Sequence, residues 1–352
     1  MKKLQFIFAA AALLVLSLGM TGCDPTNPNN PEMPAIVSIS ETNSDYGIVV
    51  EVVYKNNTRM FFLLTSPNTC ELTSYYTFYK SEGYEQYNYS GELVIPETIT
   101  HKGVIYTVTG IFSLGAIDPA TKVWIPKTVI NHGLSDLSDF TWRVTEINVS
   151  PDNPVYSSVD GVLFNKDKTE LLDFPKCSKS VSYTIPNGVR RIEAYAFYKS
   201  VTLSTITMPN SVTYIGDYAF YECSGLTTFQ IPNSVTEIGG GAFSECSSIL
   251  SVNIPEGVTV INKFLFFWCT SLNSLTIPST VTLVDQKAFY ACYSLTTLTC
   301  LATTPPATFS SIYDWEGTTF SHSHIQTIKV PAGSVSAYRA AEGWRDFTIV
   351  AL

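Results

Sequence analysis

A strict 23-residue repeat in the second half of this chain limits what the chain can fold into. Between residues 185 and 300, an apolar residue followed by proline recurs five times, always after 23 residues. Ala-Phe pairs keep the same step, with Leu265-Phe266 in one slot, and a cysteine follows in four units. The dipeptides are Ile185-Pro186, Met208-Pro209, Ile231-Pro232, Ile254-Pro255 and Ile277-Pro278. A fixed period of this length indicates stacked supersecondary units that bury their apolar sides against each other.

One unit, residues 226–249, illustrates the expected fold of each repeat. Leu226, Phe229 and Ile231 have the L-x-x-L-x-L spacing of a short strand with its apolar side chains on one side. Pro232 ends this strand, because proline has no N–H to give to a ladder, and Phe243 fills the interior farther along the coil. Strands that recur in one direction are parallel, and the roughly 17 residues between them suffice for a parallel crossover.

The line "IPNSVTxIGxxAFxxCSxLTxxxIP", clearest at residues 231–254, resembles the BspA-like leucine-rich repeat family of bacterial surface proteins. The resemblance extends from about residue 92 to residue 352. It implies an α/β-type repeat solenoid that is mostly β, right-handed and curved, with a parallel sheet on its concave side. It also implies binding of host matrix proteins or other cell-surface proteins.

The N-terminus has the features of a lipoprotein export signal. In residues 1–22, Lys2 and Lys3 precede an apolar run, and the sequence Met-Thr-Gly before Cys23 resembles a bacterial lipobox. This predicts lipidation of Cys23, with ordinary secretion and an incidental cysteine as the alternative. Residues 23–35 are rich in Pro and Asn and predict an extended tether. We expect an exported lipoprotein of the outer membrane or cell surface that contacts the membrane through its lipid only.

The rest of the chain is expected to form two caps and a solenoid. Residues 36–91 predict an N-terminal β-rich cap, residues 92–300 the solenoid with regular units at 185–300, and residues 301–352 a C-terminal cap. That last cap should contain a strand and a short helix that runs from Ser334, as N-cap, through Glu342. Several tyrosines in the first cap either close the solenoid or form an aromatic platform for sugars or protein loops. They are Tyr75, Tyr76, Tyr79, Tyr84, Tyr87 and Tyr89.

Four cysteines occupy the same position in successive units and should stack one strand spacing apart. Disulfides between adjacent units are possible at that separation, and a metal ladder is conceivable although no C-x-x-C pair exists. Ser200 fills the equivalent slot of the first unit, so the slot favours a small, weakly polar residue. We therefore expect buried free thiols. The four residues are Cys223, Cys246, Cys269 and Cys292.

Composition and motifs argue against several functions. The formal net charge of −9 makes a nucleic-acid partner unexpected, because binding phosphates requires clustered lysine and arginine. The sequence contains no G-x-S-x-G, H-E-x-x-H, P-loop or dinucleotide motif. His322 and His324 could share one side, but no third metal ligand is evident. We expect a non-enzymatic protein without cofactor or metal, and a monomer.

Two ladders of side chains are candidate binding surfaces. The outward strand positions are uncharged hydroxyls and amides, which form either a solvated β-face or a hydrogen-bonding surface. An aromatic ladder follows the core phenylalanines, and Ser244 interrupts it. Its rings either pack along the edge of the solenoid or supply contact area to a partner. The strand positions are Thr205, Thr207, Thr228, Gln230, Ser251, Asn253, Ser274 and Thr276. The aromatic positions are Tyr198, Tyr221, Phe267 and Tyr290, and Tyr195, Tyr218 and Trp268 lie beside them.

These features together predict a protein-binding or adhesion module of the cell envelope, whose partner is an extracellular or host protein. The alternative is an accessory glycan-binding surface lipoprotein, which the abundance of tyrosine and tryptophan favours. A hydrolase has the least support, because no nucleophile, base and orienting residue can be placed together from the pattern.

Overall fold

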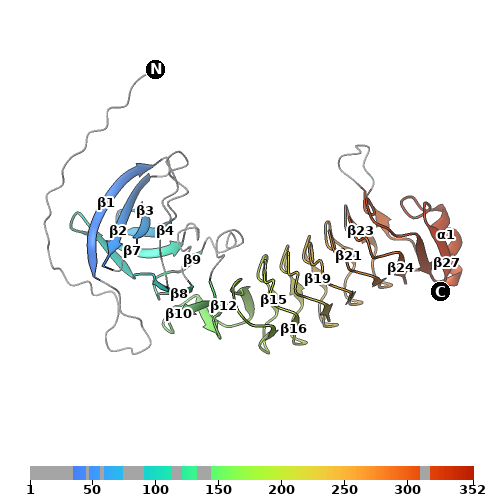
Figure 1. The fold of residues 1–352 in the computed structure, drawn as a ribbon, viewed down its shortest axis with the longest axis horizontal. Helices are drawn as coiled ribbons and strands as arrows, with labels where there is room; N and C mark the ends of the chain where they lie inside the picture. The colour runs from blue at the N-terminus through green and yellow to red at the C-terminus, as the bar shows by residue number, and fades with distance from the viewer. Residues whose placement is uncertain are drawn as a thin grey trace, which may run out of the picture.

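The computed structural model describes residues 35–44, 47–55, 59–73, 91–111, 121–132, 144–309 and 318–352. Figure 1 shows a β-sheet at the N-terminal end, a gently curved row of coils and a short helix at the C-terminal end. The expected signal peptide, Cys23 and all of the tether except Ala35 lie outside the described residues. The tyrosines between positions 75 and 89 also lie outside them.

A twisted sheet forms the N-terminal end. Its strand order is β1-β2-β3-β4-β7-β6, and β9 pairs with β7. Its inward face carries Val50, Val52, Tyr54 and Phe62, and the same apolar cluster continues into the first coils at Ile147. The sheet therefore covers the open apolar end of the solenoid. The strands are β1 (Ile36–Ser44), β2 (Gly47–Tyr54), β3 (Arg59–Ser66), β4 (Thr69–Thr73), β6 (Thr98–His101), β7 (Val104–Ile111) and β9 (Asn131–His132).

The first coils are irregular. Strands β5 (Glu92–Val94), β8 (Lys122–Ile125) and β10 (Glu146–Val149) form a parallel sheet. An antiparallel hairpin of β11 (Tyr156–Val159) and β12 (Val162–Asn165) follows. Asp160 and Gly161 form its tight turn at φ values of 51° and 77°. Strand β13 (Glu170–Asp173) then pairs with β12 on one side and with the regular coils on the other.

The L-x-x-L-x-L segments form the expected parallel strands. Thr205 pairs with Ser182 and Ser251 pairs with Thr228, which is one strand per 23-residue repeat. The fold class predicted from the repeat, a mostly β solenoid with parallel strands, is therefore confirmed. We call these strands the first ladder. They are β14 (Ser182–Thr184), β16 (Thr205–Thr207), β18 (Thr228–Phe229), β20 (Ser251–Asn253), β22 (Ser274–Ile277), β24 (Thr297–Cys300), β26 (Thr327–Val330) and β27 (Thr348–Ala351).

A second ladder of two-residue parallel strands, which the sequence did not predict, lies in the V-T-x-I segments. In Figure 1, β19, β21 and β23 follow the upper side of the row of coils, whereas β16 and β24 follow the lower side. The strands are β15 (Arg191–Ile192), β17 (Tyr214–Ile215), β19 (Glu237–Ile238), β21 (Val260–Ile261), β23 (Leu283–Val284) and β25 (Ala307–Thr308).

Hydroxyl side chains join consecutive coils beside this second ladder. Each donates a hydrogen bond to the backbone carbonyl 22 residues earlier, which explains why Ser or Thr precedes the inward valine. The bonds are Ser211 Oγ to Val189 O at 2.7 Å, Ser234 Oγ to Val212 O at 2.6 Å and Thr280 Oγ1 to Val258 O at 2.9 Å.

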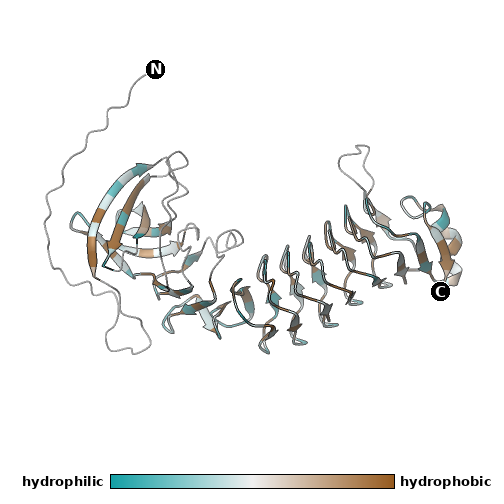
Figure 2. Ribbon diagram, viewed as in Figure 1, coloured by the Kyte–Doolittle hydropathy of each residue, from teal (hydrophilic) through white to brown (hydrophobic). Residues whose placement is uncertain are grey.

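Stacked phenylalanines fill the interior of the solenoid, as the repeat predicts. Phe197, Phe220, Phe243, Phe266 and Phe289 are all 0% exposed, and their ring centroids follow one another at 5.0 to 6.0 Å. Figure 2 shows that apolar and polar residues alternate along the coils. Each coil alone would expose its phenylalanine, so stability depends on neighbouring coils.

The C-terminal cap contains the 3-10 turn η5 (Ala332–Ser334) and the helix α1 (Val335–Ala340). Tyr338 and Trp344 are fully buried and cover the last coil, as expected. Ser334 is the N-cap residue of α1, as predicted, with φ −106° and ψ −8°, but its side chain makes no capping hydrogen bond. The helix also ends at Ala340 rather than Glu342, since Ala341 is extended.

Candidate binding surface

The strand positions predicted to face outward do so. Thr205, Thr207, Thr228 and Gln230 are exposed, as are Ser274 and Thr276, whereas Ser251 and Asn253 are half-buried. Asn253 has a structural role: its Nδ2 donates to Ile231 O and its Oδ1 accepts from Ile231 N, both at 2.8 Å. This amide extends the ladder beyond β18, so it is less available to a ligand than the neighbouring hydroxyls.

Four tyrosines form a compact group on the turn segments, which we call the tyrosine cluster. Tyr195 stacks on Tyr218 at 5.3 Å, and Tyr198 stacks on Tyr221 at 5.1 Å. Tyr218 and Tyr221 also meet edge to face at 5.9 Å. All four side chains are half-buried, so each ring presents one part to solvent while its neighbours fix its orientation.

Charged groups surround the tyrosine cluster. The ammonium groups of Lys176 and Lys199 lie 4.9 and 5.1 Å from the centroid of the Tyr198 ring, within cation–π range. Tyr221 Oη donates a 2.5 Å hydrogen bond to Glu245 Oε1. Burial, together with this bond, raises the pKa of the Tyr221 hydroxyl well above its ordinary value, so the group stays protonated and donates.

The aromatic ladder is interrupted in the next coil and then resumes. Ser244 is buried there, and a Cβ on Gly241 would overlap Tyr218 Cε1, so the ring of Tyr218 occupies the space that glycine leaves. Beyond this gap, Phe267 stacks on Tyr290 at 4.9 Å. The four predicted aromatic positions thus fall into two groups rather than one continuous row.

Trp268, Tyr293 and His324 lie beside the second group, and we call them the Trp268 cluster. Trp268 and Tyr293 are 44% and 41% exposed, and their rings meet edge to face at 6.2 Å. His324 lies over Tyr293 at 5.1 Å, and His322 lies over Tyr290 at 4.7 Å. Sequence reasoning missed Tyr293. Its signal is an aromatic residue at a position where the preceding units have Thr270 and Ser247.

Two residues of each turn segment adopt a left-handed backbone conformation. Tyr218 has φ 53° and Glu222 φ 56°, and the pair recurs one coil later at Gly241 and Glu245. These conformations let alternate N–H groups reach the next coil, as in the bond from Phe220 N to Ala242 O at 2.8 Å. Most residues pay a steric cost there, which the hydrogen bonds between coils offset.

The cysteine ladder is unbridged and buried, as expected. Each thiol donates to the carbonyl of the preceding coil's phenylalanine, for example Cys223 Sγ to Phe197 O at 2.9 Å and Cys246 Sγ to Phe220 O at 3.1 Å. Burial raises the pKa of the Cys246 and Cys292 thiols to about 12. The ladder is therefore an unreactive part of the core.

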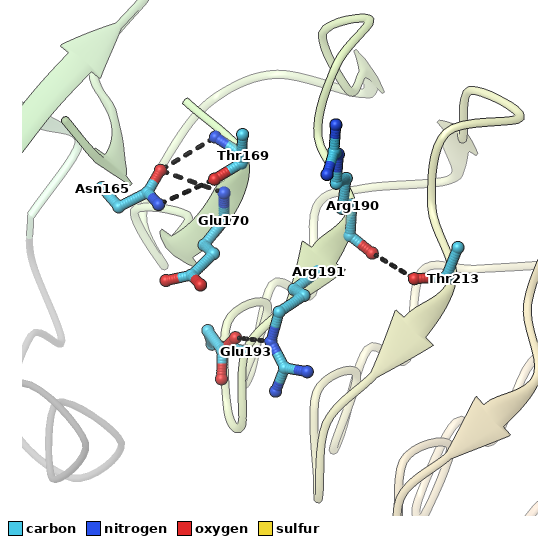
Figure 3. Close-up of polar contacts among 7 residues, drawn as sticks. All are labelled: Asn165, Thr169, Glu170, Arg190, Arg191, Glu193 and Thr213. Atoms are coloured by element: carbon cyan, nitrogen blue, oxygen red, sulfur yellow. Dashed lines mark hydrogen bonds and ion pairs between the residues drawn. The ribbon is translucent and has the colours of Figure 1, made fainter. Parts of the chain in front are cut away.

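A polar group at the start of the second ladder is structural (Figure 3). The Asn165 side chain accepts from the N–H groups of Thr169 and Glu170 at 2.8 and 3.0 Å and so closes the turn before β13. Arg191 donates from Nε to Glu193 at 2.7 Å, and its guanidinium lies 3.7 Å from the Tyr214 ring centroid. Thr213 donates to Arg190 O at 3.3 Å and joins two coils.

The described part of the chain contains neither a cluster of metal ligands nor a membrane-spanning helix. Within it, no three side chains of His, Cys, Asp or Glu come together as metal ligands, and His322 and His324 each lie against a tyrosine instead. The helices found in the same residues are too short or too polar for a membrane span.

Comparisons with known proteins agree with this fold. The solved structure of a leucine-rich repeat protein from Eubacterium ventriosum superposes with a TM-score of 0.54 at 24% identity, over 67% of this chain and 65% of that one. The match thus spans less than two thirds of that protein. The pneumococcal vaccine antigen PcpA superposes with a TM-score of 0.50 at 16% identity, over 90% of this chain and 99% of that one. At these sequence identities the similarity shows a shared fold only.

No curated protein matched the sequence. A third solved structure, a leucine rich cell surface protein from Faecalibacterium prausnitzii, gives a TM-score of 0.43 at 19% identity, over 81% of this chain and 98% of that one. The family model described as BspA type Leucine rich repeat region matches in six copies over residues 172–296. These residues are the regular coils whose two ladders and stacked phenylalanines are described above. The chain therefore contains a BspA-type leucine-rich repeat region at residues 172–296.

Proposed function

We propose that this protein is a lipoprotein of the bacterial cell surface and binds other proteins through its solenoid, as an adhesion module. The tyrosine cluster carries the proposal. Its rings are held at 5.1 to 5.9 Å from one another, and they remain partly exposed. Tyrosine is enriched at the centres of protein interfaces, because a fixed ring supplies a large contact area at a small cost in conformational entropy.

The charges around the cluster suit a protein partner. Lys199 and Glu222 approach within 3.4 Å at its edge, and Glu245 accepts from Tyr221. Interfaces between proteins combine such an apolar centre with a polar rim. The expected signal peptide and Cys23 would place this surface outside the cell, at the end of the tether of residues 23–35.

Binding can be tested by surface plasmon resonance of the mature protein over immobilised host extracellular matrix proteins. The variant Tyr221→Ser carries the serine that the next coil has at Ser244, so the fold should accept it. We expect this variant to bind the recognised matrix protein at least about tenfold more weakly. The matched control is Tyr214→Val, which removes a ring from the second ladder and inserts the residue found at Val260. Absence of binding to any matrix protein, or equal binding by Tyr221→Ser, would refute the proposal.

Anchoring and display are tested separately. Metabolic labelling with a palmitate analogue should label the wild type and not Cys23→Ala. Protease treatment of intact cells should then remove the solenoid of the wild type. A protein that is labelled but protected from protease would be a lipoprotein facing the periplasm, and the adhesion role would be wrong.

A further inference from the structure

The Trp268 cluster is a second exposed aromatic group, separated in sequence from the tyrosine cluster by the coil with Gly241 and Ser244. Its three rings lie in a chain of contacts, Trp268 to Tyr293 at 6.2 Å and Tyr293 to His324 at 5.1 Å. In the described part of residues 181–300, large apolar side chains are exposed only at Val181, Val201, Leu250, Trp268 and Tyr293. Two of these five are the rings in contact.

The fold does not require aromatic residues at these two positions. Trp268 adopts a left-handed conformation with φ 59°, in which a bulky residue is disfavoured. The coils before and after it place charged residues or alanine there, namely Lys199, Glu222, Glu245 and Ala291. The position of Tyr293 holds Ser224, Ser247 and Thr270 in other coils. Because exposed rings lower solubility and strained residues lower stability, their presence here indicates contact with a ligand.

Few charged residues lie near the cluster: Lys287 Nζ is 5.7 Å from the Tyr290 ring centroid, and Glu245 in the preceding coil donates its N–H to Phe267 O at 2.7 Å. Residues 264–284 and 288–313 contain no Asp, Glu, Lys or Arg. The same coils present exposed hydroxyls and an amide, with Ser274 and Thr276 on β22, and Asn273 and Ser294 just before the strands. A charged ligand would find few counter-charges there, so the surface favours a ligand that is polar and neutral.

We propose that the Trp268 cluster, together with the hydroxyl face of β22 and β24, binds a neutral glycan. A pyranose ring has an apolar C–H face that stacks on an aromatic ring and an equatorial edge of hydroxyls that exchange hydrogen bonds with Ser, Thr and Asn side chains. Trp268 and Tyr293 supply two rings, and Ser274 and Thr276 supply donors and acceptors on the same coils. This site is distinct from the tyrosine cluster and independent of the protein-binding proposal.

The test is a titration of the mature protein with neutral hexasaccharides built from glucose, xylose, mannose or galactose, with oligogalacturonate as an anionic comparison. Isothermal titration calorimetry measures each affinity. Each cluster variant carries the residue found at the equivalent position of an earlier coil. Trp268→Glu introduces the residue found at Glu245, and Tyr293→Ser the residue found at Ser247. Tyr214→Val, on the second ladder, is the matched control, and the thermal midpoint of each variant reports whether it folds.

We expect at least one neutral hexasaccharide to bind, and each cluster variant to weaken it by about tenfold or more. Tyr214→Val should bind as the wild type does. Failure of every neutral hexasaccharide to bind the wild type would overturn the proposal, and so would equal affinity in the folded cluster variants. Preferential binding of oligogalacturonate, or a protein ligand lost only in Trp268→Glu and Tyr293→Ser, would show that the ligand class is wrong.

Discussion

A buried carboxylate at the start of the regular coils should make stability depend on pH. Asp173 occupies the slot that Ala196, Ala219 and Ala242 fill in later coils, and it is only 2% exposed. Asp173-Phe174 matches the Ala-Phe pairs of later coils, because Phe174 stacks on Phe197 with ring centroids 5.2 Å apart. Among the described residues, Asp173 Oδ2 has no hydrogen-bond partner. Burial raises the pKa of this carboxyl to about 7, although the charge of nearby Lys176 opposes the shift.

The sign of the effect follows from the direction of that shift. The pKa of an unfolded aspartate is about 3.9, so between pH 4 and pH 7 the folded state alone binds the proton. The neutral carboxyl therefore contributes its full stabilisation of the folded state below pH 4, and this stabilisation is lost as the pH rises through 7. Each pH unit over which the folded state alone binds the proton changes the free energy of unfolding by about 1.4 kcal/mol. The range from pH 5 to pH 8 includes about two such units, so this rise should lower the free energy of unfolding by about 3 kcal/mol.

The assay is urea unfolding at pH 5 and pH 8, followed by tryptophan fluorescence, for the wild type and Asp173→Asn. Asparagine keeps the size of the side chain but does not titrate, so the variant should lose about 3 kcal/mol of the wild type's pH dependence. Asp167→Asn, at an exposed turn, is the control and should keep all of it. An equal pH dependence in wild type and Asp173→Asn would refute a neutral, buried Asp173.

Two further predictions concern the interior. Phe243→Ala should lower the free energy of unfolding by about 3–5 kcal/mol, because Phe243 is fully buried between two phenylalanine rings. Thr228 is exposed, so Thr228→Ala should change this free energy by less than about 0.5 kcal/mol. Equal effects in urea unfolding would contradict the assignment of inward and outward positions. Iodoacetamide at pH 8 should modify the exposed Cys177 rapidly and spare Cys246, whose thiol has a pKa of about 12, until denaturant is added. Peptide mass spectrometry measures both rates, and comparable rates would show that the ladder opens in the native state.

The sequence was sufficient for the features that every coil repeats. The first ladder, the inward phenylalanines and the thiol slot each recur with the 23-residue step, so several units independently indicate the same position. The second ladder was missed because its strands are only two residues long, as at Tyr214–Ile215. Their hydrogen bonds come from stacking of coils, and a two-residue apolar alternation is too short to predict a strand.

The candidate sites were only partly predictable, because they depend on single coils. Tyr198 and Tyr221 stand out by repetition, but Tyr293 and Asp173 appear once each and become visible only when the coils are aligned position by position. The division of the aromatic ladder at Gly241 also depends on where the Tyr218 ring lies, which spacing alone does not give. The structural use of Asn253 likewise depends on where the β18 ladder ends.

The direction of the hydrogen bonds between coils has a mechanical consequence. In both ladders and in the turn segments these bonds run along the long axis, from one coil to the next, as from Phe220 N to Ala242 O. A pull on the two ends loads successive coil boundaries in series, so the weakest one opens first while the others stay closed. Under tension, a molecule of this kind would lengthen in steps as single coil boundaries open.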